Sequence, residues 1–414
     1  MMMRPAHNNK EISNKLILFI ISPFLAFLYS LKNMNTKSSF VVFYAFAICF
    51  GMAFSTLSYE DLSTTRSGID AGRYRLEFER SANMSSAEFY GSLNSYFDFD
   101  GGDKDFYYIS MVYLVSRFTH NYHWLFMAFA IVFAIFQLKT LKILVENENW
   151  KNGLFCIILA VFFTWNQIFN INAMRFYTAA WIAVYAIFQI FLKNKKKYFL
   201  LLIITPFFHS SFFLFTAIFV AAYFLKKLER LWIVLFIVSF FSSTVLAEII
   251  NLIADYLPDF LANTARGYTD AERLYEHISF SGSGFWWVPM VFDSLYKIYT
   301  NLLVVMFIIN RKMIKQTECK NLYLFALIFM AFINFSIPIP ALGQRTIVMI
   351  YPIIAYIWLS CFGTNKYSWL IYIFPLIWAW QIMTYLGHYM TVLDLSFFVT
   401  SPFYMIFKYL IRPI

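Results

Sequence analysis

Long uninterrupted apolar runs recur along the whole chain, and many of them approach the length that crosses a lipid bilayer. An α-helix crosses the hydrocarbon core with about 20 consecutive apolar residues. Hydrophobic residues make up 60% of the chain and charged residues only 14%, whereas a soluble domain carries roughly 25% charged residues. Membrane β-barrels instead alternate apolar and polar residues over strands of about ten positions. The continuous runs therefore predict an all-α, polytopic membrane protein, with one transmembrane domain over residues 1–414.

We expect about thirteen membrane-spanning helices. They lie near residues 15–31, 40–57, 124–141, 154–165, 176–192, 198–208, 212–225, 231–250, 288–309, 322–337, 347–361, 369–386 and 397–408. The first run lacks a following small-residue cleavage site, so it does not resemble a removed signal peptide; Met34 is an alternative translation start that would delete it. Residues 106–117 are too short to cross and predict an amphipathic interfacial helix rich in tyrosine.

The charges of the connecting loops predict which side of the membrane each loop occupies. Lys and Arg concentrate in cytoplasmic loops, and the loop 193–197 carries four lysines. Two longer loops, about 58–105 and 251–285, are acidic: the first holds ten Asp or Glu and five Lys or Arg. We therefore place both long loops outside the cell. The net charge of +10 follows from this arrangement, and we expect no nucleic-acid partner.

The cysteines give no sign of a disulfide or a metal site. The chain has four, Cys49, Cys156, Cys319 and Cys361, and no two share an outer loop. Neither a CxxC pair nor a Cys/His spacing typical of metal binding is present in the sequence. We predict neither a metal nor another cofactor.

Polar side chains that the predicted topology brings to the outer face form the candidate site. Ionisable groups near membrane depth are costly and are functional candidates. Several arginines on one face indicate an anionic ligand, because the guanidinium fork matches phosphate oxygens in pairs. A neighbouring aspartate could act as a general base. The candidates are Arg66, Asp70 and Arg73; Asn166, Asn170, Asn172 and Arg175; His209; Arg266, Tyr268 and Asp270; and, in the last outer turn, Gln344 and Arg345.

Each of these residues also has a purely structural interpretation. Arg175 and Arg345 lie at predicted span ends, where arginines often reach towards lipid headgroups. His209 could be a hydrogen-bonded histidine at a helix end, and Asp70 could cap a short helix. The residues alone therefore indicate a membrane protein with an arginine-lined outward site.

Four short motifs, in order along the chain, resemble a known family. They are Gly68-Ile-Asp70 followed by Tyr74 and Phe78; Ala173-Met-Arg175 opening a span; Phe208-His209-Ser-Ser211 between two short spans; and Arg345 before Tyr351. With this topology the chain resembles the EpsG-like branch of the bacterial polysaccharide polymerases, the Wzy-type polymerases of O-antigen or capsule. One position departs from the family pattern: such proteins often carry Gln after the motif arginine, where this chain has Phe176.

The resemblance implies a glycosyltransferase of the bacterial plasma membrane that takes undecaprenyl-diphosphate-linked oligosaccharides as donor and acceptor. Arg175, Arg345 and Arg266 would hold the diphosphate, and Asp70 or His209 would accept the proton of the acceptor hydroxyl. Membrane lipids and a chain-length regulator protein would be its partners. Further substrate contacts are expected from Arg66, Arg73, Tyr74, Asn172, Tyr268 and Gln344.

Three other classes share part of this pattern. A ligase that transfers finished glycan to lipid A or protein needs the same kind of site. A flippase or secondary transporter is also polytopic, but transporters usually show internal repeats and polar groups near the membrane midplane. A membrane acyltransferase needs a His-centred motif, for which the lone His209 is thin support.

Overall fold

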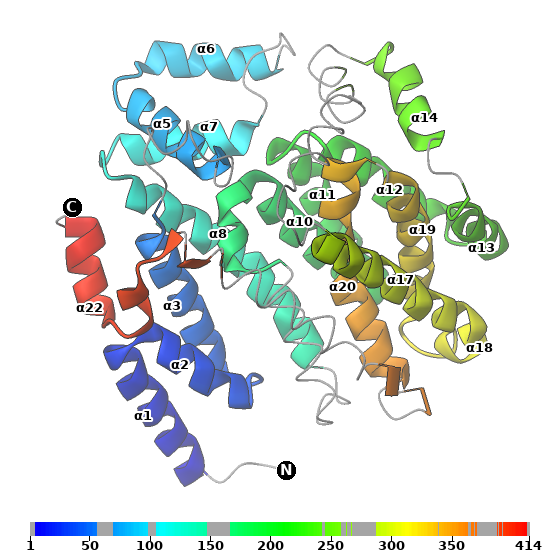
Figure 1. The fold of residues 1–414 in the computed structure, drawn as a ribbon, viewed down its shortest axis with the longest axis horizontal. Coiled ribbons are helices and arrows are strands. Elements are labelled where there is room, and N and C mark those ends of the chain that lie inside the picture. Colours follow the sequence, from blue (N-terminus) through cyan, green and yellow to red (C-terminus); the bar gives the residue numbers. More distant parts are fainter. Residues whose placement is uncertain are drawn as a thin grey trace.

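A computed structural model describes residues 5–55, 69–97, 105–146, 166–241, 245–257, 262, 266, 287–337, 339–362, 366–367, 369–370, 387, 389–390 and 392–411. Every regular element in these ranges is helical, and none of the described residues forms a strand (Figure 1). The all-α prediction is confirmed.

Three helices are long and apolar enough to cross a membrane: Tyr122–Val145, Ile168–Leu192 and Arg345–Phe362. The first is α8; the second joins η3 (Ile168–Ala173), α10 (Met174–Ile187) and the π-helical turn η4 (Phe188–Leu192); the third lies in α20 (Pro340–Phe362). The other apolar helical segments in the described part of the chain have 10–17 residues, with Ser294–Ile309 counted as the apolar part of a longer helix. These helices are those of a membrane protein, and the total of thirteen spans stays a prediction because only the described residues could be compared with it.

Several helices occupy the positions that the apolar runs predict. They are α3 (Lys37–Ala53), α12 (Phe212–Leu225), α17 (Trp287–Ile309) and α19 (Lys320–Ser336). The short tyrosine-rich helix is α7 (Phe106–Ser116). The remaining short elements are η1 (Leu31–Asn33), η5 (Lys196–Tyr198), α11 (Phe199–Ile204), η6 (Thr205–Phe207) and α18 (Arg311–Ile314).

Three predicted spans are divided in the structure. The first becomes α1 (Pro5–Ile21) and α2 (Pro23–Ser30), because Pro23 cannot donate a backbone hydrogen bond and Ser22 caps the new helix. The span near 231–250 becomes α13 (Glu229–Val238) and α14 (Val245–Ala254). The last becomes η8 (Leu395–Phe398), α22 (Pro402–Met405) and the π-helical turn η9 (Ile406–Ile411), with Ser401 as the cap before Pro402. The predicted spans 154–165 and 369–386 lie outside the described residues, except for positions 369 and 370.

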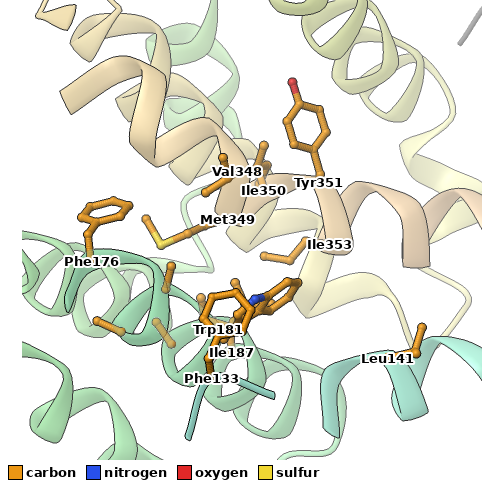
Figure 2. Close-up of a cluster of buried hydrophobic side chains, with 14 of the residues drawn as sticks. Phe133, Leu141, Phe176, Trp181, Ile187, Val348, Met349, Ile350, Tyr351 and Ile353 are labelled. Atoms are coloured by element: carbon orange, nitrogen blue, oxygen red, sulfur yellow. The ribbon is translucent and has the colours of Figure 1, made fainter. Parts of the chain in front are cut away.

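The described part of the first long loop is largely helical and covers one end of the molecule. It contains α5 (Ile69–Ser81) and α6 (Ser86–Phe97), which lie beside α7 at the top of the view, whereas α18 lies at the opposite end (Figure 1). The core lies where α8, α10 and α20 meet, and Figure 2 shows Phe133, Trp181 and Ile353 from these three helices in one cluster. Trp181 is fully buried and meets the edge of the Phe133 ring with centroids 6.4 Å apart.

A buried lysine fastens the first helix to the start of α3. Lys15 is 2% exposed, and its Nζ donates to Glu11 Oε1 at 2.5 Å and to the Ser39 hydroxyl at 2.8 Å. The hydroxyls of Thr36 and Ser38 accept further hydrogen bonds from it at 2.9 Å. A buried ion is tolerated only when it is paired and fully hydrogen-bonded, and this cage meets both conditions.

Gly51 allows a close approach of α3 to α8. A Cβ atom built on Gly51 would lie 2.5 Å from the Cβ of Ala130 and 2.7 Å from the carbonyl oxygen of Phe126. We expect Gly51→Ala to lower stability by about 1–3 kcal/mol through overpacking. Thermal unfolding in detergent measures this. Gly91→Ala in α6 is the matched control, because nothing lies within 4 Å of its added Cβ; equal melting temperatures for the two variants would contradict the assignment.

Candidate functional site

The centre of the candidate site is an ion pair between two segments that are far apart in sequence. Arg175 lies in the first turn of α10, and its Nη1 is 2.6 Å from Asp105 Oδ2. Asp105 immediately precedes α7, and its Oδ1 accepts the backbone N–H of Ser210 at 3.1 Å. Asp105 is 3% exposed, whereas Arg175 is 24% exposed. The carboxylate is thus buried, whereas the Arg175 side chain stays partly open to solvent.

Tyrosine rings hold the Arg175 guanidinium in place. Its Nε donates to the Tyr74 hydroxyl at 3.0 Å, and its central carbon lies 5.4 Å and 5.8 Å from the ring centroids of Tyr74 and Tyr108. Tyr74 lies on the buried face of α5 together with Ala71 and Phe78, three and four residues away. Burial raises the pKa of Tyr74 to about 12, although Arg175 acts in the opposite direction. Tyr74 therefore remains a neutral phenol at physiological pH.

Arg345, the second arginine of the candidate site, reaches this group from another helix, α20. The sequence places Arg345 in a turn, but α20 begins at Pro340, so Arg345 lies in its second turn. Its guanidinium carbon is 5.8 Å from the Phe176 ring centroid. Phe176, next to Arg175, meets the His209 ring edge to face at 5.5 Å. The three predicted residues Arg175, His209 and Arg345 are thus brought together around Phe176.

His209 is held as a neutral imidazole. Burial is the first cause that lowers its pKa well below the usual value, and the charges of Arg175 and Arg345 lower it further. Its Nδ1 accepts the backbone N–H of Ser211 at 3.2 Å and lies 2.8 Å from the Ser211 hydroxyl. Because Nδ1 is an acceptor, the proton of the neutral ring lies on Nε2. His209 therefore offers a hydrogen-bond donor to the site.

Asp70 is the more accessible carboxylate near this group. Its Oδ1 is 3.0 Å from Arg73 Nη2, in an i,i+3 pair whose side chains are 28% and 56% exposed. The charge of Asp70 affects the pKa of Tyr74, which places it at the edge of the site. Ion pairs this exposed contribute little to stability, so the pair leaves Asp70 available for chemistry.

The polar tip before α10 has two roles. Asn166 and Asn170 are buried and bonded to each other at 3.0 Å, and the Asn166 carbonyl accepts the Trp181 indole N–H at 3.0 Å. These two residues shape η3. The Oδ1 of Asn172 is different: it is buried and has no hydrogen-bond donor among the described residues. A buried acceptor without a partner is unfavourable, so Asn172 favours a ligand that donates a hydroxyl hydrogen.

Other predicted residues lie apart from this group or outside the described structure. Arg266 pairs with Asp255 Oδ1 at 2.8 Å beyond the end of α14, and both side chains are largely exposed. Arg66, Tyr268 and Asp270 lie outside the described residues, and for Gln344 only the helical backbone is described.

Sequence reasoning missed Asp105, Tyr108 and the direct role of Phe176. Asp105 could have been found from its position, because it is the last acidic residue of the first long loop and directly precedes a predicted helix rich in tyrosine. Within the described ranges, no group of three or more His, Cys, Asp or Glu could hold a metal ion.

The helices and this site define a helical membrane protein with a cationic, aromatic-lined site built from α5, α7, α10 and α20. The model of the EpsG family matches residues 62–402, a range that contains every candidate site residue. The chain belongs to the EpsG family, whose members are membrane proteins of polysaccharide biosynthesis. No curated protein and no solved structure matches it.

Proposed function

We propose that this protein is a glycosyltransferase that polymerises undecaprenyl-diphosphate-linked oligosaccharide repeat units on the outer face of the bacterial plasma membrane. The observation that carries the proposal is the convergence of Arg175 and Arg345 beside a neutral His209. Family membership and two arginines at one site both favour a diphosphate-linked donor. A chain-length regulator protein and membrane lipids would be its partners.

The reaction breaks the bond between the anomeric carbon of the donor sugar and its diphosphate oxygen. The bonding electron pair leaves with the undecaprenyl diphosphate, and an acceptor hydroxyl oxygen forms the new bond to the anomeric carbon. Arg345 and the partly exposed Arg175 would stabilise the negative charge that develops on the departing diphosphate. No nucleotide sugar is needed, because the lipid diphosphate is already activated.

Asp70 is the preferred general base, and it would accept the proton of the acceptor hydroxyl. It is the more exposed of the two carboxylates, since Asp105 is buried against Arg175 and the Ser210 N–H. His209 is better suited to donate a hydrogen bond from Nε2 to a sugar or diphosphate oxygen, because Nδ1 is already occupied. The Asn172 Oδ1 would accept from a sugar hydroxyl.

Arg345→Ala tests the proposal. Arg345 has no carboxylate partner among the described residues, so its removal leaves no buried charge unpaired. In a strain lacking the native gene, we expect the variant to reach the membrane normally but to cut polymerisation about 10²–10³-fold, as for other stabilisers of developing negative charge. Surface glycan would then run as single repeat units instead of a ladder.

Arg311→Ala is the matched control, because this arginine is exposed and lies in α18 at the opposite end of the molecule (Figure 1). It should leave the ladder unchanged. Loss of all surface glycan from Arg345→Ala would favour a ligase or a flippase over a polymerase. An intact ladder would show that Arg345 has no part in the reaction.

A further inference from the structure

A second polar site lies at the other end of α8, away from the Arg175 group. A groove of about 580 Å³ separates the first turns of α3 from the last turns of α8. Its walls include Lys37, Phe40 and Tyr44 from α3 and Leu138, Lys139 and Lys142 from α8. On α8, Phe129 packs against Tyr74 of the candidate site. Lys142 is thirteen residues further along, about 20 Å away at the rise of an α-helix, so the two sites are separate.

The groove is basic at its mouth. Lys37, Lys139 and Lys142 are all exposed, and Glu146 is the one acidic residue among the described residues that line the groove. Lys142 Nζ lies 3.7 Å from Glu146 Oε1, in a pair whose side chains are more than half exposed. Neither Lys37 nor Lys139 has a carboxylate partner among the described residues. Among the described residues, at least two cations of the groove therefore lack a carboxylate counter-charge.

Aromatic rings position one of these amines, and a helix end adds to the positive field. The Lys139 Nζ lies 5.3 Å from the Phe136 ring centroid and 5.7 Å from that of Tyr185, which holds the amine beside the groove. Lys37 is the first residue of α3, and the N-terminus of a helix carries a partial positive charge. Three amines and this helix end thus favour an anion.

The deeper walls are apolar. Phe40, Tyr44, Ile135 and Leu138 continue the groove between the two helices, and Leu138 is 9% exposed. A volume of this size lies within the roughly 300–1,000 Å³ of small-molecule sites. A ligand that fills it therefore needs an anionic head and an apolar tail. Basic pockets between membrane helices on the cytoplasmic side suit anionic lipid headgroups.

We propose that this groove binds an anionic phospholipid of the cytoplasmic leaflet. The lysines would contact the phosphodiester, and the first part of one acyl chain would lie against Phe40, Tyr44 and Leu138. The predicted topology, with basic loops in the cytoplasm, puts the start of α3 and the end of α8 on that side. The proposal is independent of the reaction at the Arg175 group.

Native mass spectrometry of the full-length protein, with added phosphatidylglycerol or phosphatidylcholine, tests the proposal. We expect the wild type to retain phosphatidylglycerol at least tenfold more strongly. Lys37→Gln/Lys139→Gln/Lys142→Gln should weaken that binding tenfold or more, since each basic residue near an anionic surface contributes about a fivefold factor. All three lysines are exposed, so we expect the variant to fold normally.

Lys193→Gln/Lys195→Gln/Lys196→Gln is the matched control, because it removes the same charge from exposed lysines just before η5 and at its first residue. It should leave phosphatidylglycerol binding within twofold of the wild type. An equal loss in both triple variants would overturn the groove as a specific site. Equal retention of the two lipids would also overturn it. If millimolar inorganic phosphate displaced bound phosphatidylglycerol as strongly as added lipid does, the site would bind phosphate alone, and the lipid proposal would be overturned.

Discussion

Arg175→Ala is expected to abolish polymerisation and to destabilise the protein, and a second substitution should separate the two effects. The variant removes a guanidinium that would stabilise the departing diphosphate, a loss of about 10²–10³-fold. It also leaves the carboxylate of Asp105, 3% exposed, without its cationic partner. Breaking a buried pair in this way costs about 3–5 kcal/mol. An inactive single variant would therefore not show which loss is responsible.

The double variant Arg175→Ala/Asp105→Asn removes both charges. The asparagine keeps an oxygen for the Ser210 N–H, which Asp105 Oδ1 now accepts at 3.1 Å. We expect its melting temperature in detergent to return most of the way to the wild-type value, while the surface glycan stays at single repeat units. If the double variant regained the ladder, Arg175 would serve only to neutralise Asp105, and the proposed diphosphate site would have to depend on other residues.

Glu11→Gln is expected to be the most destabilising change outside the site. Glu11 and Lys15 are 7% and 2% exposed, and they form the only charged contact within the cage described above. Neutralising Glu11 leaves a buried ammonium with hydroxyl partners alone, which costs about 3–5 kcal/mol. Because the hydroxyls belong to Thr36, Ser38 and Ser39, we expect the contact between α1 and the start of α3 to loosen first.

Melting temperatures in detergent and limited proteolysis ahead of α3 measure this effect. Glu11→Gln/Lys15→Met, which removes both charges, should recover most of the stability. The control is Glu79→Gln, which breaks the i,i+4 pair with Arg75, where the side chains are 47% and 34% exposed. Exposed pairs contribute about 0–1 kcal/mol. A loss no greater than that of the control would mean that the Lys15 cage is not stabilised by its charges.

Helix positions and candidate site residues could be predicted from the sequence wherever a single run of residues determines them. The apolar runs located α8 and α12 because helix formation depends on local composition. Asp70, Arg175, His209 and Arg345 were selected because charge is rare in such a chain, and all four lie in or beside one group. The proline at position 23 could have predicted the division of the first span, since a proline has no N–H for the helix.

The sequence could not predict in the same way which residues far apart in the chain contact each other. The partner of Arg175 lies 70 residues earlier in the chain, and ten acidic residues of the first long loop were equivalent candidates. The helix that ends at Val238 is followed by phenylalanines and serines, which do not forbid a helix, so local composition does not predict this end. Similarly, the sequence predicts Asn166 and Asn170 at an outer tip, but in the structure both are buried and hydrogen-bonded to each other.

The contacts of the Asp105 carboxylate with Arg175 and with the Ser210 N–H affect how substrates can enter and leave the proposed site. One oxygen contacts Arg175 at the start of α10, and the other accepts the N–H of Ser210 just before α12. A single side chain at the end of the first long loop therefore connects both segments. A movement of the start of α7 would break both contacts at once. In the proposed polymerisation, substrates that enter and leave at every addition would therefore pass through the site most simply without breaking the Asp105 contacts.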